Sequence, residues 1–525
     1  MRPEFPAGQS HFCCKQTVSS TPVGSDQNLD ELPPKQRCTE GASTENKEGP
    51  RPLRFLQSHT RSSPVSTMTL LEDPDMGSFG PELPAMFDGV KLAAVATVLY
   101  VIVRCLNLNS TTAPPEVGHQ DTPLSRYLFK SCPLLTKEYI PPLLWGKSGH
   151  LQTALYGKMG RVNTPTLYGF RKFLPMPDGA TATFDLFEAR GDHSTGDDVT
   201  MVICPGIGNH SEKNYIRTFV DHSQRQGYRC AVLNHLGALP DMELTSPRMF
   251  TYGCTWEYAA MVGYIKRAFP ETLLVVVGFS LGGNIVCKFL GESPSNQDRV
   301  LCCVTVCQGY SALRVQETFL QWDQCRRLYN FMLADRMKTL ILSHRSSLLG
   351  LNGSNIGDVD LNRLYAATSL MQIDDSIMRK FHGYSSLNEY YEKESCLNYI
   401  HKVTVPLFLL NSLDDPLIHP SLLEIPRALA EKMPNVMFAL TQHGGHLGFF
   451  EGAMLFPQPL TWMDKVIVEY ADALCHWEKN RPACQRSSHQ DMNSYLKRTG
   501  LTSSETRVHP LLAFGSCCSL SLESR

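Results

Sequence analysis

The stretch LLVVVGFSLGG, residues 273–283, decides the fold of this 525-residue chain. Five apolar residues, three of them valine, stand directly before the pattern Gly-x-Ser-x-Gly. A run this short and this rich in valine is typical of a strand that is buried on both faces of a parallel sheet. Apolar residues at helical spacing resume after Gly283. A strand therefore has to reverse into a helix within a few residues.

Such a reversal gives Ser280 a strained backbone conformation and lifts its hydroxyl above the sheet edge. Gly278 and Gly282 are required because a Cβ at either position would strike the crossing backbone. The alternative is a glycine-rich turn that holds an incidental serine. Because the bare five-residue pattern recurs by chance, partner residues have to be found before Ser280 is interpreted as a nucleophile.

Strand-like runs and helical segments alternate on both sides of this stretch. This alternation predicts a mostly parallel twisted sheet with helices on both faces, the α/β-hydrolase fold, over residues 171–479. Residues 309–402 break the rhythm with several helical stretches, among them 311–332, and are predicted to form a helical cap. The predicted strands are 183–187, 201–204, 230–234, 273–279, 300–307, 405–410 and 436–440, with helices at 256–267 and 462–474.

The loops after the last two predicted strands hold the partners that a serine nucleophile needs. Asp414 and Asp415 follow the first of these strands, and His443 and His446 follow the second. The carboxyl ends of parallel strands meet at one sheet edge, where Ser280 also stands. In such a site a histidine takes the serine proton, and a buried carboxylate orients the histidine.

We favour Asp415 as the acid because Pro416 fixes the turn after it, and Asp414 then bonds loop amides or caps the turn. We favour His446 as the base because two glycines before it allow a tight approach and the apolar segment after it can bury it. His443 is then a loop histidine. The two histidines lack a third ligand and an H-E-x-x-H pattern, so we expect no metal and no cofactor.

Two backbone N–H groups are expected to stabilise the negative charge that develops during acyl transfer. Leu281 follows the nucleophile directly, and Ile207 lies in the Pro-Gly turn 205–208 that follows the predicted strand 201–204. Each donor of this kind is typically worth about 3 kcal/mol in the barrier.

Charge and cysteine placement exclude several classes of protein. With 49 basic and 51 acidic residues, the net charge of −2 gives no sign of a nucleic-acid partner. The chain has 18 cysteines but no C-x-x-C pair, which argues against a zinc ribbon or a redox motif. Those in or beside the apolar runs are expected to be buried free thiols: Cys204, Cys287, Cys302, Cys303 and Cys307.

The ends of the chain differ from the rest in composition. Residues 1–80 are polar and proline-rich and are predicted to be a disordered extension, and residues 480–525 are predicted to be a polar tail. Residues 110–170 are predicted to be a loop-rich arm.

Residues 87–108 are predicted to be a single-pass N-terminal membrane anchor. Between Lys91 and Arg104 stand twelve uncharged residues, which as a helix span roughly 18 Å against about 30 Å of hydrocarbon. Counting the whole segment, with Lys91 and Arg104 reaching toward the interfaces, gives sufficient length. The alternative is an amphipathic or buried helix.

These motifs resemble those of the α/β-hydrolase-domain-containing lipases, a membrane-anchored group that includes monoacylglycerol lipases. The resemblance implies Ser280, Asp415 and His446 as the catalytic triad, hydrolysis of acylglycerol esters, and a type II signal anchor in the plasma membrane or an endomembrane. It also brings a steroid as a candidate partner, which nothing in the residues themselves indicates. The resemblance covers 81–479 and rests on 145–153, 205–207, 278–284, 414–416 and 444–448.

Sequons at Asn109, Asn209 and Asn352 suit a domain outside the cytosol, as the resemblance implies. Asn209 lies two residues after Ile207, where a glycan would crowd the site, so we expect it to be unglycosylated or turned away from the pocket. Buried free thiols instead suit a reducing compartment. The side of the membrane on which the domain lies therefore stays open.

The pattern as a whole predicts a serine hydrolase that cleaves lipid esters, chiefly monoacylglycerol, through an acyl-enzyme on Ser280. The expected partners are the lipid ester and a membrane, with no nucleic acid. The alternatives are an acyltransferase that uses the same triad and a receptor-like protein that binds a lipid or steroid. The intact triad favours an enzyme over a receptor, whereas the sequence does not separate hydrolysis from acyl transfer.

Overall fold

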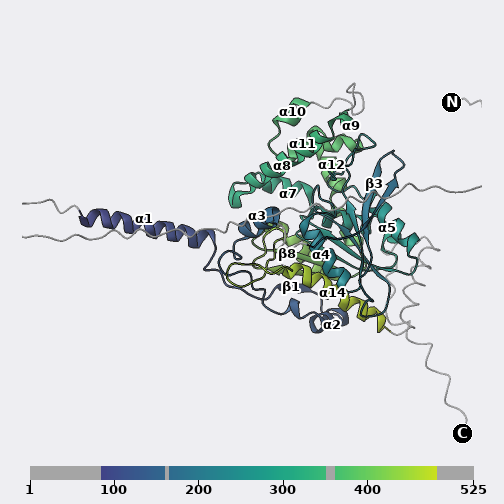
Figure 1. The fold of residues 1–525 in the computed structure, drawn as a ribbon, viewed down its shortest axis with the longest axis horizontal. Coiled ribbons are helices and arrows are strands. Elements are labelled where there is room, and N and C mark those ends of the chain that lie inside the picture. The colour runs from purple at the N-terminus through teal and green to yellow at the C-terminus, as the bar shows by residue number, and fades with distance from the viewer. Residues whose placement is uncertain (1–83, 160–164, 350–360, 482–525) are drawn as a thin grey trace, which may run out of the picture. The chain divides into compact units, whose positions relative to one another are not determined.

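The computed structural model describes residues 84–159, 165–349 and 361–481 (Figure 1). The predicted extension 1–80 and all but the first two residues of the predicted tail lie outside this part of the chain. The described residues belong to one compact unit, 82–525.

Within the described ranges, one nine-stranded sheet runs in the order β1-β9-β8-β7-β6-β4-β5-β3-β2. The neighbours from β5 through β4, β6, β7 and β8 to β9 are parallel, whereas the pairs β1–β9, β3–β5 and β2–β3 are antiparallel. The prediction of a mostly parallel sheet is confirmed. The strands are β1 (Glu116–His119), β2 (Phe170–Pro175), β3 (Thr181–Phe187), β4 (Val199–Cys204), β5 (Arg229–Asn234), β6 (Leu273–Phe279), β7 (Val300–Val306), β8 (Leu407–Ser412) and β9 (Val436–Thr441).

Helices cover both faces of the sheet, which explains why the central strands are continuous apolar runs. In β6, Leu274 and Val276 join one buried cluster, and Val275 and Val277 join the other. One face is covered by α5 (Trp256–Ala268), α6 (Leu281–Glu292), α13 (Glu424–Lys432) and the cap. The other is covered by α2 (Pro123–Ser131), α4 (Asn214–Arg225) and α14 (Trp462–Lys479). The cysteines predicted to be buried free thiols are all buried and unpaired.

The predicted arm contributes more regular structure than its loop-rich sequence indicates. It contains β1, which extends the sheet by pairing with β9, as well as α2 and α3 (Gly149–Met159). The strand β1 has one aliphatic residue in four and no buried residue. An edge strand of this kind is hydrogen-bonded on one side only and has no continuous apolar run, so its sequence lacks the signal of a strand.

A helical cap follows β7, as predicted. The predicted helix 311–332 is wrong as one element, because the chain breaks between α7 and α8 where Gln324 and Cys325 adopt φ values of 51° and 54°. No glycine marks this break in the sequence. The cap helices are α7 (Ala312–Phe319), α8 (Arg326–Ser343), α9 (Arg345–Leu349), α10 (Leu361–Ala366), α11 (Leu370–Ser376) and α12 (Leu387–Glu394).

The segment predicted as an anchor forms α1 (Pro84–Cys105), and from residue 89 to its end every side chain except Val103 is exposed. Within the described ranges, no helix combines the length and the hydropathy of a membrane-spanning segment. Residues 106–115 link α1 to β1. The side chain of Asn107 in this link donates to the carbonyl of Lys147 at 3.1 Å, and the Lys147 ammonium donates to the carbonyl of Ser110.

The reversal from β6 into α6 takes place at Ser280, whose φ of 54° and ψ of −119° are rare for a residue with a side chain. A Cβ on Gly278 would lie 2.6 Å from the carbonyl oxygen of Gly282, and one on Gly282 would lie 2.1 Å from that of Cys204. Real Cβ atoms do not approach backbone this closely, so both glycines are required, as the sequence predicts.

Gly282→Ala is therefore expected to destabilise the domain by about 3 kcal/mol or more, because the added methyl group meets the rigid end of β4. Urea unfolding measures the loss. Gly191→Ala is the matched control, since a Cβ at Gly191 has no heavy atom within 4 Å. Equal stability of the two variants would contradict the close approach of α6 and β4.

Candidate active site

Ser280, His446 and Asp415 form one hydrogen-bonded chain. The Ser280 hydroxyl lies 2.8 Å from Nε2 of His446, and Nδ1 of His446 lies 2.8 Å from Oδ2 of Asp415. Asp415 is 1% exposed and His446 is 6% exposed. The second oxygen of Asp415 accepts hydrogen bonds from the backbone N–H groups of Leu417 and Ile418 at 2.8 and 3.2 Å. These bonds fix the carboxylate so that it holds one tautomer and one orientation of the imidazole.

Asp414 and His443 lie next to this chain but take no part in it. Oδ1 of Asp414 accepts from the backbone N–H of Gly445 at 2.8 Å, and its other oxygen lies 3.6 Å from Nδ1 of His443. Nε2 of His443 lies 3.1 Å from the hydroxyl of Ser110. Burial raises the pKa of Asp414. Asp414 therefore shapes the loop that carries His446.

The arm also supports the histidine loop, a contribution that the sequence analysis missed. The backbone N–H of His446 donates to the hydroxyl of Thr153 on α3 at 2.8 Å. Gln152 accepts from the N–H of Phe450 at 2.9 Å. A Cβ on Gly149 would lie 1.9 Å from the carbonyl oxygen of Asp414. The only available signal was the match of residues 145–153 to the lipase motif, which carries no information about these contacts.

The predicted oxyanion donors border Ser280. A Cβ on Gly206 would lie 3.5 Å from the Cβ of Ser280, which places the turn after β4 against Ser280. Ile207 and Leu281 both line the cavity into which Ser280 faces. Among the described residues, the Ile207 N–H has no hydrogen-bond acceptor. Leu281 is the first residue of α6, where an N–H has no acceptor within the helix.

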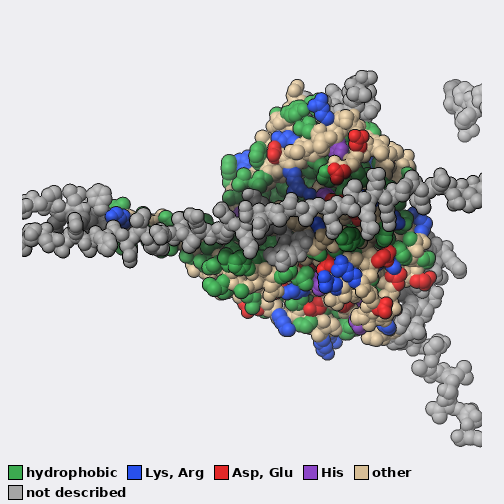
Figure 2. All heavy atoms as spheres, viewed as in Figure 1, with side chains coloured by type: hydrophobic (Ala, Val, Ile, Leu, Met, Phe, Trp, Pro, Cys, Tyr) green, Lys and Arg blue, Asp and Glu red, His purple; other side chains and the backbone are tan. Residues whose placement is uncertain are grey.

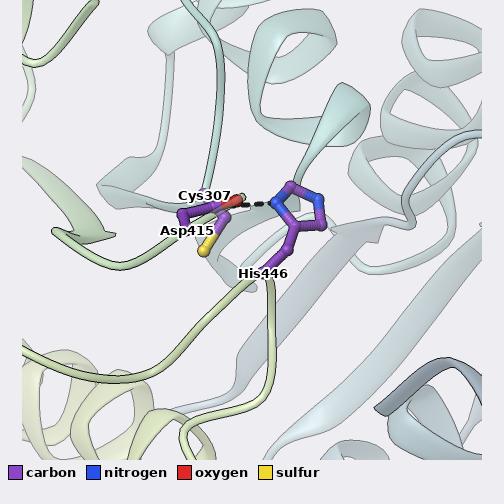
Figure 3. A group of neighbouring side chains, drawn as sticks. All are labelled: Cys307, Asp415 and His446. Carbon is purple, nitrogen blue, oxygen red and sulfur yellow. Dashed lines mark hydrogen bonds and ion pairs between the residues drawn. The ribbon is translucent and has the colours of Figure 1, made fainter. Parts of the chain in front are cut away.

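Cys307 lies beside Asp415 and His446 (Figure 3). Its sulfur, a carboxylate oxygen of Asp415 and a ring nitrogen of His446 lie within 4.8 Å of one another. Burial, followed by the negative charge of Asp415, raises the pKa of the Cys307 thiol well above its ordinary value. Asp415 and His446 are bonded to each other, so the three residues do not fit a metal site.

A cavity of about 700 Å³ opens at Ser280 between the sheet edge, the arm and the cap. Its walls are mainly apolar. They come from α8 (Leu328, Met332, Leu333, Met337), from α11 (Leu370, Ile373) and from the acid loop (Leu417, Ile418). On the arm side, His150 stacks on Tyr329 of α8 with ring centroids 5.8 Å apart. Burial lowers the pKa of His150, which favours a neutral ring at the cavity wall.

The sequons lie in different surroundings. Asn209 lines the cavity, and its amide nitrogen lies 3.4 Å from the hydroxyl of Tyr215. It is therefore not turned away from the pocket, so that part of the expectation is wrong. Its lack of a glycan stays a prediction. Asn109 is exposed in the link between α1 and β1, and Asn352 lies outside the described residues.

Comparison with known proteins identifies the family to which this chain belongs. The α/β hydrolase fold family matches residues 199–453. "Monoacylglycerol lipase ABHD2" of Danio rerio is 75% identical over 418 residues, which cover 80% of this chain and 96% of that protein. The chain belongs to the α/β-hydrolase family. It is an enzyme of the carboxylic ester hydrolase class.

A second relative is matched over a similar length. "Monoacylglycerol lipase ABHD2" of Homo sapiens is 72% identical over 407 residues, covering 77% of this chain and 96% of that protein. Among solved structures, an esterase of Pyrococcus furiosus, Pf2001, aligns with a TM-score of 0.35 at 15% identity. That alignment covers 64% of this chain and 95% of the esterase.

Single substitutions of the two neighbouring acids, Asp415 and Asp414, distinguish their roles. Asp415→Asn is expected to lower kcat on a short p-nitrophenyl ester by about 10⁴-fold, because the amide favours the wrong tautomer of His446. Asp414→Asn is expected to lower kcat less than about tenfold, because the amide oxygen still accepts from Gly445. Thermal unfolding checks that both variants are folded. A larger loss with Asp414→Asn would reverse the assignment.

Proposed function

We propose that this protein is a serine hydrolase that cleaves carboxylic esters of acylglycerols, chiefly monoacylglycerol. The observation that carries the proposal is the hydrogen-bonded chain from Asp415 through His446 to Ser280, which ends in a large apolar cavity. A cavity of about 700 Å³ has room for a long acyl chain. The names of the relatives, monoacylglycerol lipases, point to the same substrate class.

In the proposed reaction, Ser280 attacks the ester carbonyl and His446 takes the hydroxyl proton. Asp415 stabilises the imidazolium that forms. The N–H groups of Leu281 and Ile207 donate to the oxyanion of the tetrahedral intermediate. His446 then gives its proton to the leaving alcohol. Water, activated by His446, attacks the acyl-enzyme and releases the fatty acid and free Ser280.

We also propose that the enzyme works against a membrane, with α1 as its N-terminal anchor. Leu328 and Met332 line the cavity and are 57% and 55% exposed, so the cavity opens onto the outer face of α8. Trp322 and Phe331, which lie close by along the chain, are 82% and 46% exposed. Hydrophobic side chains gather at this edge of the cap in Figure 2. An exposed apolar rim around a lipid-binding cavity suits contact with a bilayer that holds the substrate.

The nucleophile is tested with Ser280→Ala. The variant is expected to lose covalent labelling by a fluorophosphonate probe and to lose hydrolysis of monooleoylglycerol by at least about 10³-fold. Ser346→Ala, which changes an exposed serine of the cap, is expected to retain both. Labelling that persists in Ser280→Ala would assign the nucleophile elsewhere. Affinity for a lipid or steroid with no turnover by the native protein would favour a receptor.

The cap rim is tested with the double change Trp322→Glu and Phe331→Glu. These changes are expected to lower hydrolysis of monooleoylglycerol in phospholipid vesicles at least about tenfold, because two charges then oppose insertion. Hydrolysis of a short, water-soluble ester is expected to stay within about twofold, since neither residue lines the cavity. Gln321→Glu with Gln324→Glu adds the same charge without removing apolar surface. An equal loss of monooleoylglycerol hydrolysis in vesicles for both double variants would contradict the lipid contact.

A further inference from the structure

The cavity has two unlike regions. Along α8 its lining is mainly apolar, as at Leu328, Met332 and Leu333, but it includes the charged Arg336. Under the cap, Tyr252, Asp374 and Tyr390 also line the cavity and bring polar atoms to a mainly apolar wall. Polar groups in such a wall are unfavourable unless they find partners, either in the protein or in a ligand.

Asp374 has one oxygen committed to the protein. It stands on α11, and Oδ2 accepts a hydrogen bond from the hydroxyl of Tyr391 on α12 at 2.9 Å. No described residue forms a hydrogen bond or ion pair with its other oxygen, and the side chain borders the cavity. Burial raises the pKa of Asp374 to about 7. In its protonated form the carboxyl group is both a donor and an acceptor for a ligand hydroxyl.

Tyr252 supplies a second polar group at the cavity wall. Its backbone N–H donates to the hydroxyl of Tyr390 at 3.0 Å, whereas its own hydroxyl has no hydrogen-bond partner among the described residues. A Cβ on Gly309, two residues after Cys307, would lie 3.6 Å from that hydroxyl. Burial raises the pKa of Tyr252, so its hydroxyl stays protonated.

We propose that Asp374 and Tyr252 form the subsite that binds the glycerol hydroxyls of a monoacylglycerol, while the acyl chain runs along α8 toward the exposed rim. This inference rests on the proposed hydrolase function. The glycerol of a monoacylglycerol carries two free hydroxyls, and the two side chains provide matching donors and acceptors. A substrate without hydroxyls leaves both groups unpaired and is disfavoured.

The subsite is tested by comparing two esters of the same acid, 1-monooleoylglycerol and ethyl oleate. Asp374→Leu is expected to lower kcat/KM for monooleoylglycerol at least about tenfold, while kcat/KM for ethyl oleate changes less than about twofold. Tyr252→Phe, which removes one hydroxyl, is expected to act in the same direction with a loss of about fivefold. Asp374→Asn is expected to retain most of the preference, because an amide also donates and accepts.

Tyr391→Phe is the matched structural control. It removes the bond between α11 and α12 without changing the carboxyl group at the cavity wall. It is therefore expected to change kcat/KM for both esters by the same factor. If Asp374→Leu also lowers kcat/KM equally for both esters, Asp374 serves only to hold the cap together, and the proposed subsite is wrong.

A binding measurement separates failure of the subsite from failure of the hydrolase proposal. In the Ser280→Ala background, the binding of 1-O-hexadecylglycerol, an ether that lacks the scissile ester bond, is compared with the binding of hexadecyl methyl ether. Asp374→Leu is expected to weaken binding of the glycerol ether about tenfold and to leave that of the methyl ether unchanged. If the native enzyme cleaves neither ester, the hydrolase proposal fails. In that case the binding measurement alone decides on the subsite: a selective loss for the glycerol ether supports it, and an equal effect on both ethers overturns it.

Discussion

The reversal of β6 into α6 at Ser280 is the constraint on which the rest of the site depends. A non-glycine residue at φ 54° costs on the order of 1–3 kcal/mol and persists only where neighbours over-determine it. Here Gly278 and Gly282 allow backbone approaches that a Cβ would prevent, and the N–H of Ser280 donates to the carbonyl of Val306 at the end of β7. Because β4 and β7 both hold the reversal, the loops that follow these strands adjoin Ser280.

The loop that carries His446 is held by a second set of contacts, one from the arm and one from the loop after β8. Thr153 on α3 accepts from the backbone of His446, and Asp414 accepts from that of Gly445. The histidine loop is thus fixed from the arm and from the acid loop at the same time. Such support holds His446 within hydrogen-bond distance of Ser280 before any substrate is bound, so the proposed proton transfer needs little reorganisation at this point.

Much of this arrangement follows from sequence, and the physical reason is burial. Strands covered on both faces leave unbroken apolar runs, so β6 and the strands that precede the acid and histidine loops are recognisable. The strand β1 is not, because it pairs on one side only and has no buried residue. The contact of Thr153 with His446 joins residues 293 positions apart, and no local pattern encodes it. Tyr252 and Asp374 meet the same cavity only because the cap folds over the sheet.

The short link between α1 and β1 sets a limit on where catalysis can take place. Its ten residues, 106–115, reach at most about 35 Å when fully extended, and β1 is hydrogen-bonded along its length to β9, the strand before the histidine loop. A membrane that holds α1, as proposed, therefore keeps β1 and the loop of His446 that follows β9 within reach of this link. Esters within that reach would then meet the enzyme at a high local concentration, whereas esters in the bulk have to diffuse into it before they are cleaved.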